Sequence, residues 1–292
     1  MVRKIFKWTG IVIGSIIVLA LCAYAFIAHD ISKRRSRVYK FTAEDIYIPR
    51  DSATIARGHH LIVTRGCTDC HGTNMAGKMV VDDPPVGTLY GANLTRGKGG
   101  LPATFTTANW VMALRHGVTP EGRPLLLMPA HETVQLCEND LAAVIAYCQQ
   151  LPPVDNVVKP AKVGPLSNIM TYMGKMPLLS VEMIDHHAPM VKVADTVEGI
   201  ALGKYLSVAC TGCHRSNLKG GDPVAPGFPK VPNITASGEP GGWTKAQFIH
   251  TLRTGQKPDG RQMKPEDMPW KMTAQYEEKE LASLYAYLHS IR

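Results

Sequence analysis

One set of short motifs occurs twice, in the same order, along this chain of 292 residues. The segment Cys67-Thr68-Asp69-Cys70-His71 recurs as Cys210-Thr211-Gly212-Cys213-His214, and Met128-Pro129 recurs as Met268-Pro269. The other matched pairs are Asn93-Leu94-Thr95 with Asn233-Ile234-Thr235, Leu114-Arg115-His116-Gly117 with Leu252-Arg253-Thr254-Gly255, Gly122-Arg123 with Gly260-Arg261, and Ala146-Tyr147 with Ala286-Tyr287. A period near 140 residues indicates two homologous domains rather than a solenoid of short repeats.

The local pattern of each copy predicts a small helical unit. Helices are expected over 52–66, 106–116 and 138–150 in the first copy, and over 196–208, 245–254 and 276–290 in the second. Ser52 and Thr196 are candidate N-caps, and Thr244-x-x-Gln247 is a capping-box pattern. Stretches rich in Gly and Pro, 72–102 and 215–242, predict loops. Such units are all-α and have weak cores of their own, which suggests that a cofactor supplies the missing apolar bulk.

The Cys-x-x-Cys-His motif has a specific chemistry. Two cysteines three residues apart on a helical turn can each add to a vinyl group of one haem, and the next histidine then faces the iron as its proximal ligand. A structural zinc site would need four convergent Cys or His ligands, and a thioredoxin-like redox pair would need a βαβ context. The sequence therefore predicts two covalently bound haem c groups, held by Cys67, Cys70 and His71 and by Cys210, Cys213 and His214.

The sixth iron ligand should come from farther along each copy. Met128 and Met268 occupy equivalent positions in irregular chain and precede the last helix at equal spacing, so they are the predicted ligands. The alternative is that they are core residues, since the chain has 13 methionines. His131 and His250 are rival ligands. The counterpart of His131 in the second copy is Lys271, however, and His250 lies inside a predicted helix. The predicted iron ligands are thus His71, Met128, His214 and Met268.

The net charge of +8 is confined to one end of the chain. The first forty residues hold eight of the 32 Lys and Arg residues and only one acid, so the remaining 252 residues are almost neutral. That distribution argues against a nucleic-acid-binding face on the body. Within the basic end, Trp8–Ala28 has no charged residue and is long enough to cross one bilayer core.

We expect this apolar segment to be an uncleaved membrane anchor, with a cleaved signal peptide as the alternative. Five basic residues follow the segment and three precede it, so a simple positive-inside count would place the body in the cytoplasm. The haem motifs demand the opposite side, because haem c is attached outside the cytoplasm. The predicted organisation is an anchor with a basic juxtamembrane segment (1–40), two cytochrome c domains (41–153 and 195–292) and an ordered linker between them (154–194), with a helical turn near 169–173 and a surface turn at His186-His187.

Both copies resemble class I c-type cytochromes, and their shared motifs are similar to those of the cytochrome c subunits of membrane alcohol, aldehyde and gluconate dehydrogenases. The linker stretches Lys175–Leu179 and Ile184–His186 also resemble that family. The family's subunits usually carry three haems, whereas this chain has two motifs. The resemblance implies that Tyr147 and Tyr287 pack near haem. It also implies that four arginines lie near propionates or on domain surfaces: Arg115, Arg123, Arg253 and Arg261.

The predicted function is single-electron transfer by a dihaem cytochrome anchored in a bacterial inner membrane, with its haem domains in the periplasm. The donor is expected to be a dehydrogenase or a quinol-oxidising complex, and the acceptor an oxidase or a soluble cytochrome. The chain is a free carrier or a subunit of a larger complex, and no independent catalysis is expected. The alternative is a dihaem oxidoreductase such as a peroxidase or a sulfur-compound dehydrogenase, which would need one iron without its Met ligand.

Overall fold

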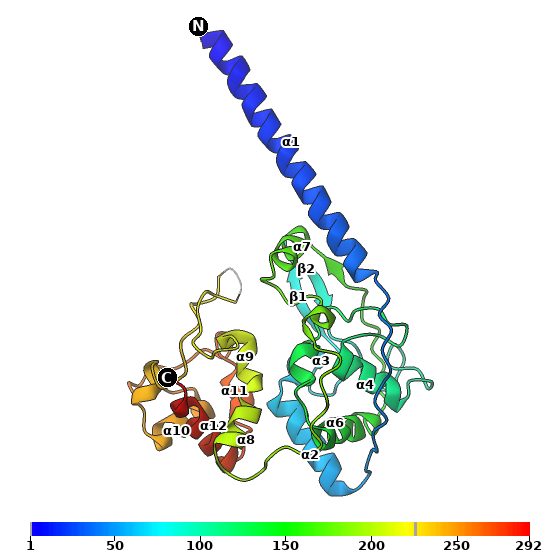
Figure 1. Cartoon of the computed structure of the whole chain (residues 1–292), viewed down its shortest axis with the longest axis vertical. Coiled ribbons are helices and arrows are strands. Elements are labelled where there is room, and N and C mark those ends of the chain that lie inside the picture. The colour runs from blue at the N-terminus through cyan, green and yellow to red at the C-terminus, as the bar shows by residue number, and fades with distance from the viewer. Residues whose placement is uncertain (1, 225–226) are drawn as a thin grey trace.

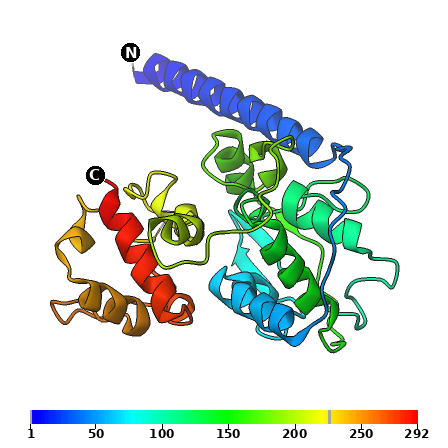
Figure 2. The same ribbon diagram turned by 60° about the horizontal axis from the view of Figure 1, so that its bottom comes forward.

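The computed structural model describes residues 2–224 and 227–292, and one long helix projects from a two-part body (Figure 1). That helix is α1 (Val2–Arg35), which extends beyond the apolar run at both ends. The body holds the two copies of the repeat, joined by the linker, and Figure 2 shows them side by side below α1. The prediction of a mostly helical chain is confirmed.

In the first copy, two long helices cross closely. They are α2 (Ser52–Thr64) and α6 (Glu138–Gln149), and a Cβ atom on Gly58 would come within 2.0 Å of the Ala143 carbonyl oxygen. Only glycine allows that approach. The remaining helices of this copy are α3 (Cys67–His71), α4 (Thr107–His116) and α5 (Ala130–Thr133). Leu61, Val111 and Leu141 lie in the centre of the resulting core.

A small antiparallel sheet joins the first copy to the linker. Its strands lie in the order β1 (Met79–Asp83), β2 (Gly87–Tyr90) and β3 (Lys162–Val163). The linker then forms α7 (Pro165–Tyr172) and the 3₁₀ turn η1 (Ser180–Met183). The sequence predicted the helical turn, but α7 begins earlier, because Pro165 starts a helix readily, and the sheet was not predicted.

The second copy repeats the helices of the first, and its described residues, 195–224 and 227–292, form no counterpart of the sheet. Here α8 (Ile200–Leu206) crosses α12 (Glu278–Ser290), and a Cβ on Gly203 would lie 2.0 Å from the Ser283 carbonyl oxygen. The other elements are α9 (Val208–His214), η2 (Glu239–Gly242), α10 (Lys245–Thr254) and α11 (Trp270–Thr273). The two crossings therefore use equivalent glycines of the repeat.

One of the expected helix caps agrees with the structure, and two do not. The Thr244–Gln247 capping box opens α10 as predicted. The expected caps Ser52 and Thr196 are wrong: Asp51 caps α2 by accepting a bond from the Thr54 N–H, and α8 begins after Gly199. An aspartate carboxylate one residue earlier accepts that bond in place of the Ser52 hydroxyl.

The segment between α1 and α2 runs along the first copy, and its Phe41 packs against two histidines, His116 and His186. Phe41 stacks on His186 with ring centroids 3.9 Å apart, and His186 Nδ1 lies 2.9 Å from His116 Nδ1. His186 and His187 lie in the turn that the sequence predicted, where the Ala188 N–H donates to the Asp185 carbonyl oxygen at 3.3 Å, although the ring of Phe41, from a distant segment, partly covers His186. His187, the next residue, is exposed as expected.

Candidate haem sites

The first Cys-x-x-Cys-His motif forms the short helix α3, set at an angle to α2 by Gly66. Gly66 adopts a left-handed φ of 71°, which lets the chain turn sharply between the two helices. Burial raises the pKa of Cys67 to about 12 and also raises the pKa of Cys70, so both thiols are neutral and face apolar surroundings. Both residues line one recess together with His71 and Met128.

His71 is held in the tautomer that a metal ligand needs. Its Nδ1–H donates a hydrogen bond of 2.8 Å to the Ala92 carbonyl oxygen, which leaves the lone pair on Nε2 free. Burial also lowers the pKa of His71, so the imidazole is neutral near pH 7. The backbone of the loop after α3 thus fixes the ring before any iron binds.

An apolar cavity of about 440 Å³ adjoins this recess and includes Cys70, His71 and Met128 in its wall. Trp110 lines it too, and its Nε1–H is buried without a hydrogen-bond partner among the described residues. Buried indole N–H groups normally have a partner. A haem with its carboxylate-bearing edge would fill such a cavity and offer that acceptor, so the residues present fit the cofactor that the motif predicts.

Met128 lies in a loop that the linker supports. Ser180 Oγ donates to the Met128 carbonyl oxygen at 2.6 Å, and the Leu127 N–H donates to the Leu178 carbonyl oxygen at 2.9 Å. Leu127 adopts a φ of 62°, an uncommon conformation for leucine that needs such support. The structure therefore brings the four predicted residues of the first copy, Cys67, Cys70, His71 and Met128, to one recess.

The second motif repeats this local geometry. Cys210, Cys213 and His214 lie on α9, and the His214 Nδ1–H donates a 2.9 Å bond to the Pro232 carbonyl oxygen. Burial lowers the pKa of His214 and raises the pKa of Cys210 to about 12. Cys213 differs in being exposed.

Met268 lies in the same local setting as Met128. Pro129 and Pro269, the residues that follow them, cap the short helices α5 and α11 with nearly equal angles, φ −79° and ψ 57° against φ −75° and ψ 57°. Thr273 Oγ1 then donates to the Leu252 carbonyl oxygen at 2.7 Å, as Thr133 does to Leu114. The repeat equivalence that selected the two methionines is therefore also an equivalence of backbone geometry.

The structure gives other partners to residues that the resemblance placed near haem. Tyr147 and Tyr287 lie at the two helix crossings, with Cβ atoms within 3 Å of the positions a Cβ would take on Gly58 and Gly203. The arginines bind protein groups. Arg115 pairs with Glu44 at 2.6 Å, and Arg253 pairs with Glu278 at 3.2 Å. Arg123 and Arg261 are exposed.

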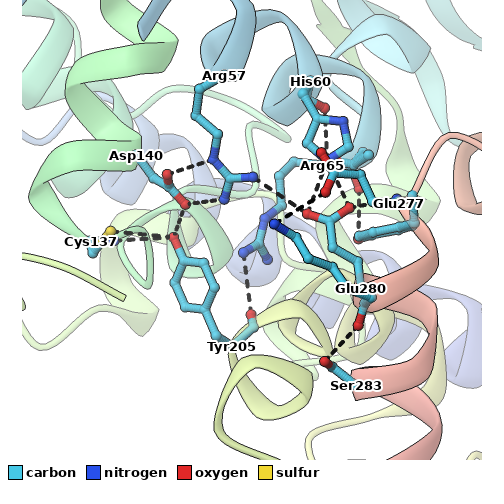
Figure 3. Close-up of polar contacts among 12 residues, drawn as sticks. Arg57, His60, Arg65, Cys137, Asp140, Tyr205, Glu277, Glu280 and Ser283 are labelled. Atoms are coloured by element: carbon cyan, nitrogen blue, oxygen red, sulfur yellow. Dashed lines mark hydrogen bonds and ion pairs between the residues drawn. The ribbon is translucent and has the colours of Figure 1, made fainter. Parts of the chain in front are cut away.

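The two copies meet through a polar cluster, which Figure 3 shows and which we call the interdomain cluster: Arg57, His60 and Asp140 from the first copy, and Tyr205 and Glu280 from the second. Arg57 binds both oxygens of Asp140 at 2.9 and 2.8 Å and reaches Glu280 at 3.4 Å. His60 Nε2 lies 2.8 Å from Glu280, and the Tyr205 hydroxyl donates to Asp140 at 2.7 Å.

The interdomain cluster has a near-twofold pattern. His60 and Tyr205 both lie two residues after a crossing glycine, and Asp140 and Glu280 occupy matched positions of the closing helices. Each copy thus presents a donor to the acid of the other copy, as in an isologous dimer interface. Burial alone would raise the pKa of Asp140, but the hydrogen bonds and charge of Arg57 outweigh it and hold that pKa below its ordinary value.

The same interface places the two motif helices close together. A Cβ on Gly212, in α9, would lie 2.6 Å from Glu132 Oε1, and Ala209 of α9 lines the first recess beside Cys67. Burial raises the pKa of Glu132 to about 7. In the second copy Met272 occupies the position of Glu132 and lies against Gly66, just before α3. This contact between the copies was not predicted from the sequence.

Comparisons with known proteins agree with this geometry. Residues 200–292 match the family model for cytochrome c. The chain is similar to the fructose dehydrogenase cytochrome subunit of Gluconobacter japonicus, with 24% identity over 260 residues, which cover 82% of this chain and 52% of that protein. It is also similar to the cytochrome c subunit of quinone-dependent alcohol dehydrogenase of Gluconacetobacter polyoxogenes, with 26% identity over 172 residues, 56% of this chain and 36% of that protein.

A shorter match joins it to the gluconate 2-dehydrogenase cytochrome c subunit of Pantoea cypripedii, with 29% identity over 102 residues, which cover 33% of this chain and 23% of that protein. The chain spans about half the length of the fructose dehydrogenase subunit. These matches indicate covalently bound haem c and electron transfer.

Proposed function

From the cytochrome c domain over residues 200–292, we propose that this chain is a membrane-anchored dihaem electron-transfer protein. It takes single electrons from a membrane or periplasmic dehydrogenase, or from a quinol-oxidising complex, and passes them to an oxidase or a soluble cytochrome. The observation that carries the proposal is the repeated geometry of α3 and α9. Each places a Cys-x-x-Cys-His motif on a short helix and fixes the His Nδ1–H on a backbone carbonyl.

The residues of each copy have distinct roles in this function. The four motif cysteines would hold two haems, one per copy, through thioether bonds, and a bound haem supplies a one-electron Fe(II)/Fe(III) couple. His71 and His214 offer neutral Nε2 atoms, and Met128 and Met268 offer thioether sulfur. A thioether ligand favours a higher potential than a second imidazole does. The mostly apolar wall of the cavity around Met128 gives the first site surroundings of low polarity.

The contact between the copies supports electron passage within the chain. The interdomain cluster buries Asp140 and Glu280. Separating the copies would take partners away from these buried acids, which is costly, so the cluster holds the two copies in one arrangement. Ala209 of α9 lines the recess of the first site, so little protein separates the two motif helices.

A dehydrogenase is the favoured electron donor, because three similar proteins are cytochrome subunits of fructose, alcohol and gluconate dehydrogenases. The anchor proposal rests on α1, which has a mean hydropathy of 2.7 over its most apolar window, none of which is buried against the body. Haem c attachment places the body in the periplasm, and anchoring raises its effective concentration near membrane partners.

Optical and redox measurements on the purified full-length chain test the electron-transfer proposal. We expect two one-electron steps and a sulfur-to-iron charge-transfer band with the intensity of two haems. A high-spin ferric signal together with peroxide turnover would contradict it and favour the oxidoreductase alternative.

Mild detergent extraction tests the partner. We expect a dehydrogenase subunit to co-purify with the full-length chain and to reduce it on addition of substrate. Purification of the chain alone from its native membrane would instead indicate a free carrier.

A further inference from the structure

Helix α7 lies against the body-proximal end of α1 in both views (Figures 1 and 2). The rings of Phe26 and Tyr172 meet edge to face with centroids 6.2 Å apart. Asn168 Nδ2 donates to the Tyr24 hydroxyl at 3.4 Å. The linker therefore reaches α1 at residues that belong to its apolar run.

These contacts fix the depth of α7 in a membrane that α1 spans. Tyr24 and Phe26 lie four and two residues before Ala28, the last residue of the uncharged run. At about 1.5 Å per residue they are roughly 6 and 3 Å inside its end. A bilayer core of about 30 Å that holds Trp8–Ala28 therefore places both residues, and the α7 side chains beside them, at the membrane interface.

Helix α7 buries small polar side chains and exposes apolar groups at its C-terminal end, while Leu166, Ile169 and Met170 are half-buried. Its small polar residues face the protein: Ser167 is 0% exposed and Thr171 is 6% exposed. Its end carries apolar and aromatic groups outward, with Tyr172 46% exposed and Met173 62% exposed. A surface helix in water normally buries its apolar side chains and exposes its polar ones, whereas a helix at a lipid surface shows this opposite arrangement.

Exposed lysines lie on both segments that make this contact. Lys175 is exposed two residues after Met173, and Lys33 is exposed on the last turn of α1. Aromatic side chains and snorkelling lysines are the usual residues of the membrane–water interface, and lysines there attract anionic headgroups.

We propose that α7 is a second membrane contact, which seats Tyr172 and Met173 among the lipid headgroups and upper acyl chains of the membrane that α1 spans. The inference rests on the anchoring role of α1 in the proposed function.

Such a contact orients the first haem site. The Gly164 and Leu166 N–H groups donate to the Val86 and Pro85 carbonyl oxygens at 2.8 Å each, which fixes α7 to the β1–β2 hairpin. Leu89 of β2 lines the cavity of about 440 Å³. Docking of α7 would therefore add a second point of attachment that holds this cavity at one orientation to the membrane, beside the bond of Arg34, on the last turn of α1, to Glu182.

Cysteine protection in liposomes tests the inference on the full-length, haem-loaded chain. In a Cys22→Ser background, single cysteines replace Met173 (test), Leu19 (inside the span) and Val197 (control). Val197 is 72% exposed and precedes α8, a helix of the second copy that lies away from α1 in Figure 1. A water-soluble maleimide is applied to phosphatidylcholine–phosphatidylglycerol vesicles that carry few chains each, so that self-association cannot cause protection.

We expect the cysteine at 173 to react about tenfold more slowly than the cysteine at 197, although both native side chains are exposed in the structure. The inference is overturned if the cysteine at 173 reacts as fast as the one at 197 while the cysteine at 19 stays protected; the anchor then stands. Modification of the cysteine at 19 would instead contradict the anchor itself. A bimane label at 173, quenched by lipids brominated near the headgroup, is the second readout, and an unquenched label would also overturn the inference.

Discussion

The two copies of the repeat share the parts proposed to face a haem and differ in the parts that support them. Both have a crossing glycine, a motif helix, a histidine fixed on a carbonyl oxygen and a Met-Pro turn. The first copy adds a sheet, the linker bonds to Met128 and an unpartnered Trp110 N–H. The second copy holds its Met268 loop by local bonds, such as the one that Trp270 Nε1 donates to the Met263 carbonyl oxygen at 3.0 Å.

The difference indicates that the residues proposed to bind haem need few supporting contacts. The sheet and the linker bonds of the first copy instead hold that copy in place within the chain. The linker that supports Met128 is also the segment that carries α7 to α1. If α1 spans a membrane as proposed, the first copy would lie nearer to it, and the interdomain cluster would hold the second copy against the first.

The largest expected effect comes from the helix crossings. Gly203→Val forces a side chain into the Ser283 carbonyl, at a cost of about 3 kcal/mol or more, since overpacked sites cannot relax against backbone. Thermal unfolding followed by near-ultraviolet circular dichroism should show an early transition of the second copy, with the sheet-supported first copy still folded. Gly242→Ala, where nothing lies within 4 Å, is the control. Simultaneous unfolding of both copies would contradict the assignment of separate cores.

The interdomain cluster gives the next effect. Glu280→Ala removes a buried acid from His60 and Arg57 and should separate the unfolding transitions of the two copies, at about 2 kcal/mol, below the cost for a fully buried pair because Arg57 is partly exposed. Calorimetry measures this. Glu278→Ala, on the same helix but exposed, should change little.

Acid should mimic Glu280→Ala. Burial alone would raise the pKa of Glu280, but hydrogen bonds from His60 and the charges of His60 and Arg57 lower it overall. The joined copies therefore bind fewer protons than the separated ones, so this stabilisation is present above the ordinary carboxyl range and fades as the pH falls below about 4. Transitions that stay merged at pH 3 would contradict this assignment.

A smaller effect concerns Trp110, whose counterpart in the second copy is Phe248. Trp110→Phe removes the buried N–H from the cavity wall and makes the first site resemble the second. Because the positive end of that N–H disfavours charge on a ferric centre, we expect one potential to fall by a few tens of millivolts, where 59 mV is a tenfold change. Redox titration measures the shift, with Phe105→Leu as the apolar control. An unchanged titration would show that the N–H does not face the cofactor.

The smallest predicted effect is pH dependence from Glu132. Burial raises the pKa of this acid to about 7, and its counterpart in the second copy is Met272. Above that pH the carboxylate stabilises the ferric state, so the potential of the nearer haem should fall slightly as the pH rises through 7. Glu132→Gln and Glu132→Met should both flatten the curve. If the slope persisted in both variants, another group would be responsible.

The helices could be predicted, and the motif and Met-Pro positions proposed for the haem sites could be selected, because both depend on local signals and on repeat equivalence. The capping box, the Cys-x-x-Cys-His motif and the Met-Pro turn all act within a few residues. The short strands β1 and β2 were not predicted, because they have only five and four residues. β1 also includes Asp82 and Asp83, so it shows no clear alternation of apolar and polar residues.

The contacts between distant segments could not be predicted from one sequence. Nothing local indicates that Arg57 meets Asp140 and Glu280, or that Phe41 covers His186. Such pairs form only when whole helices are placed, and their residue types are equally at home on a solvated surface.

The central claim is that each copy holds one haem covalently, and peptide mapping of the full-length chain tests it most directly. Protease digestion and mass spectrometry should yield two haem-bearing peptides, one with Cys67–His71 and one with Cys210–His214. Cys67→Ala/Cys70→Ala should remove only the first peptide, Cys210→Ala/Cys213→Ala only the second, and Cys22→Ser neither. A wild-type chain with a single haem-bearing peptide, or a double variant that keeps both, would contradict the account.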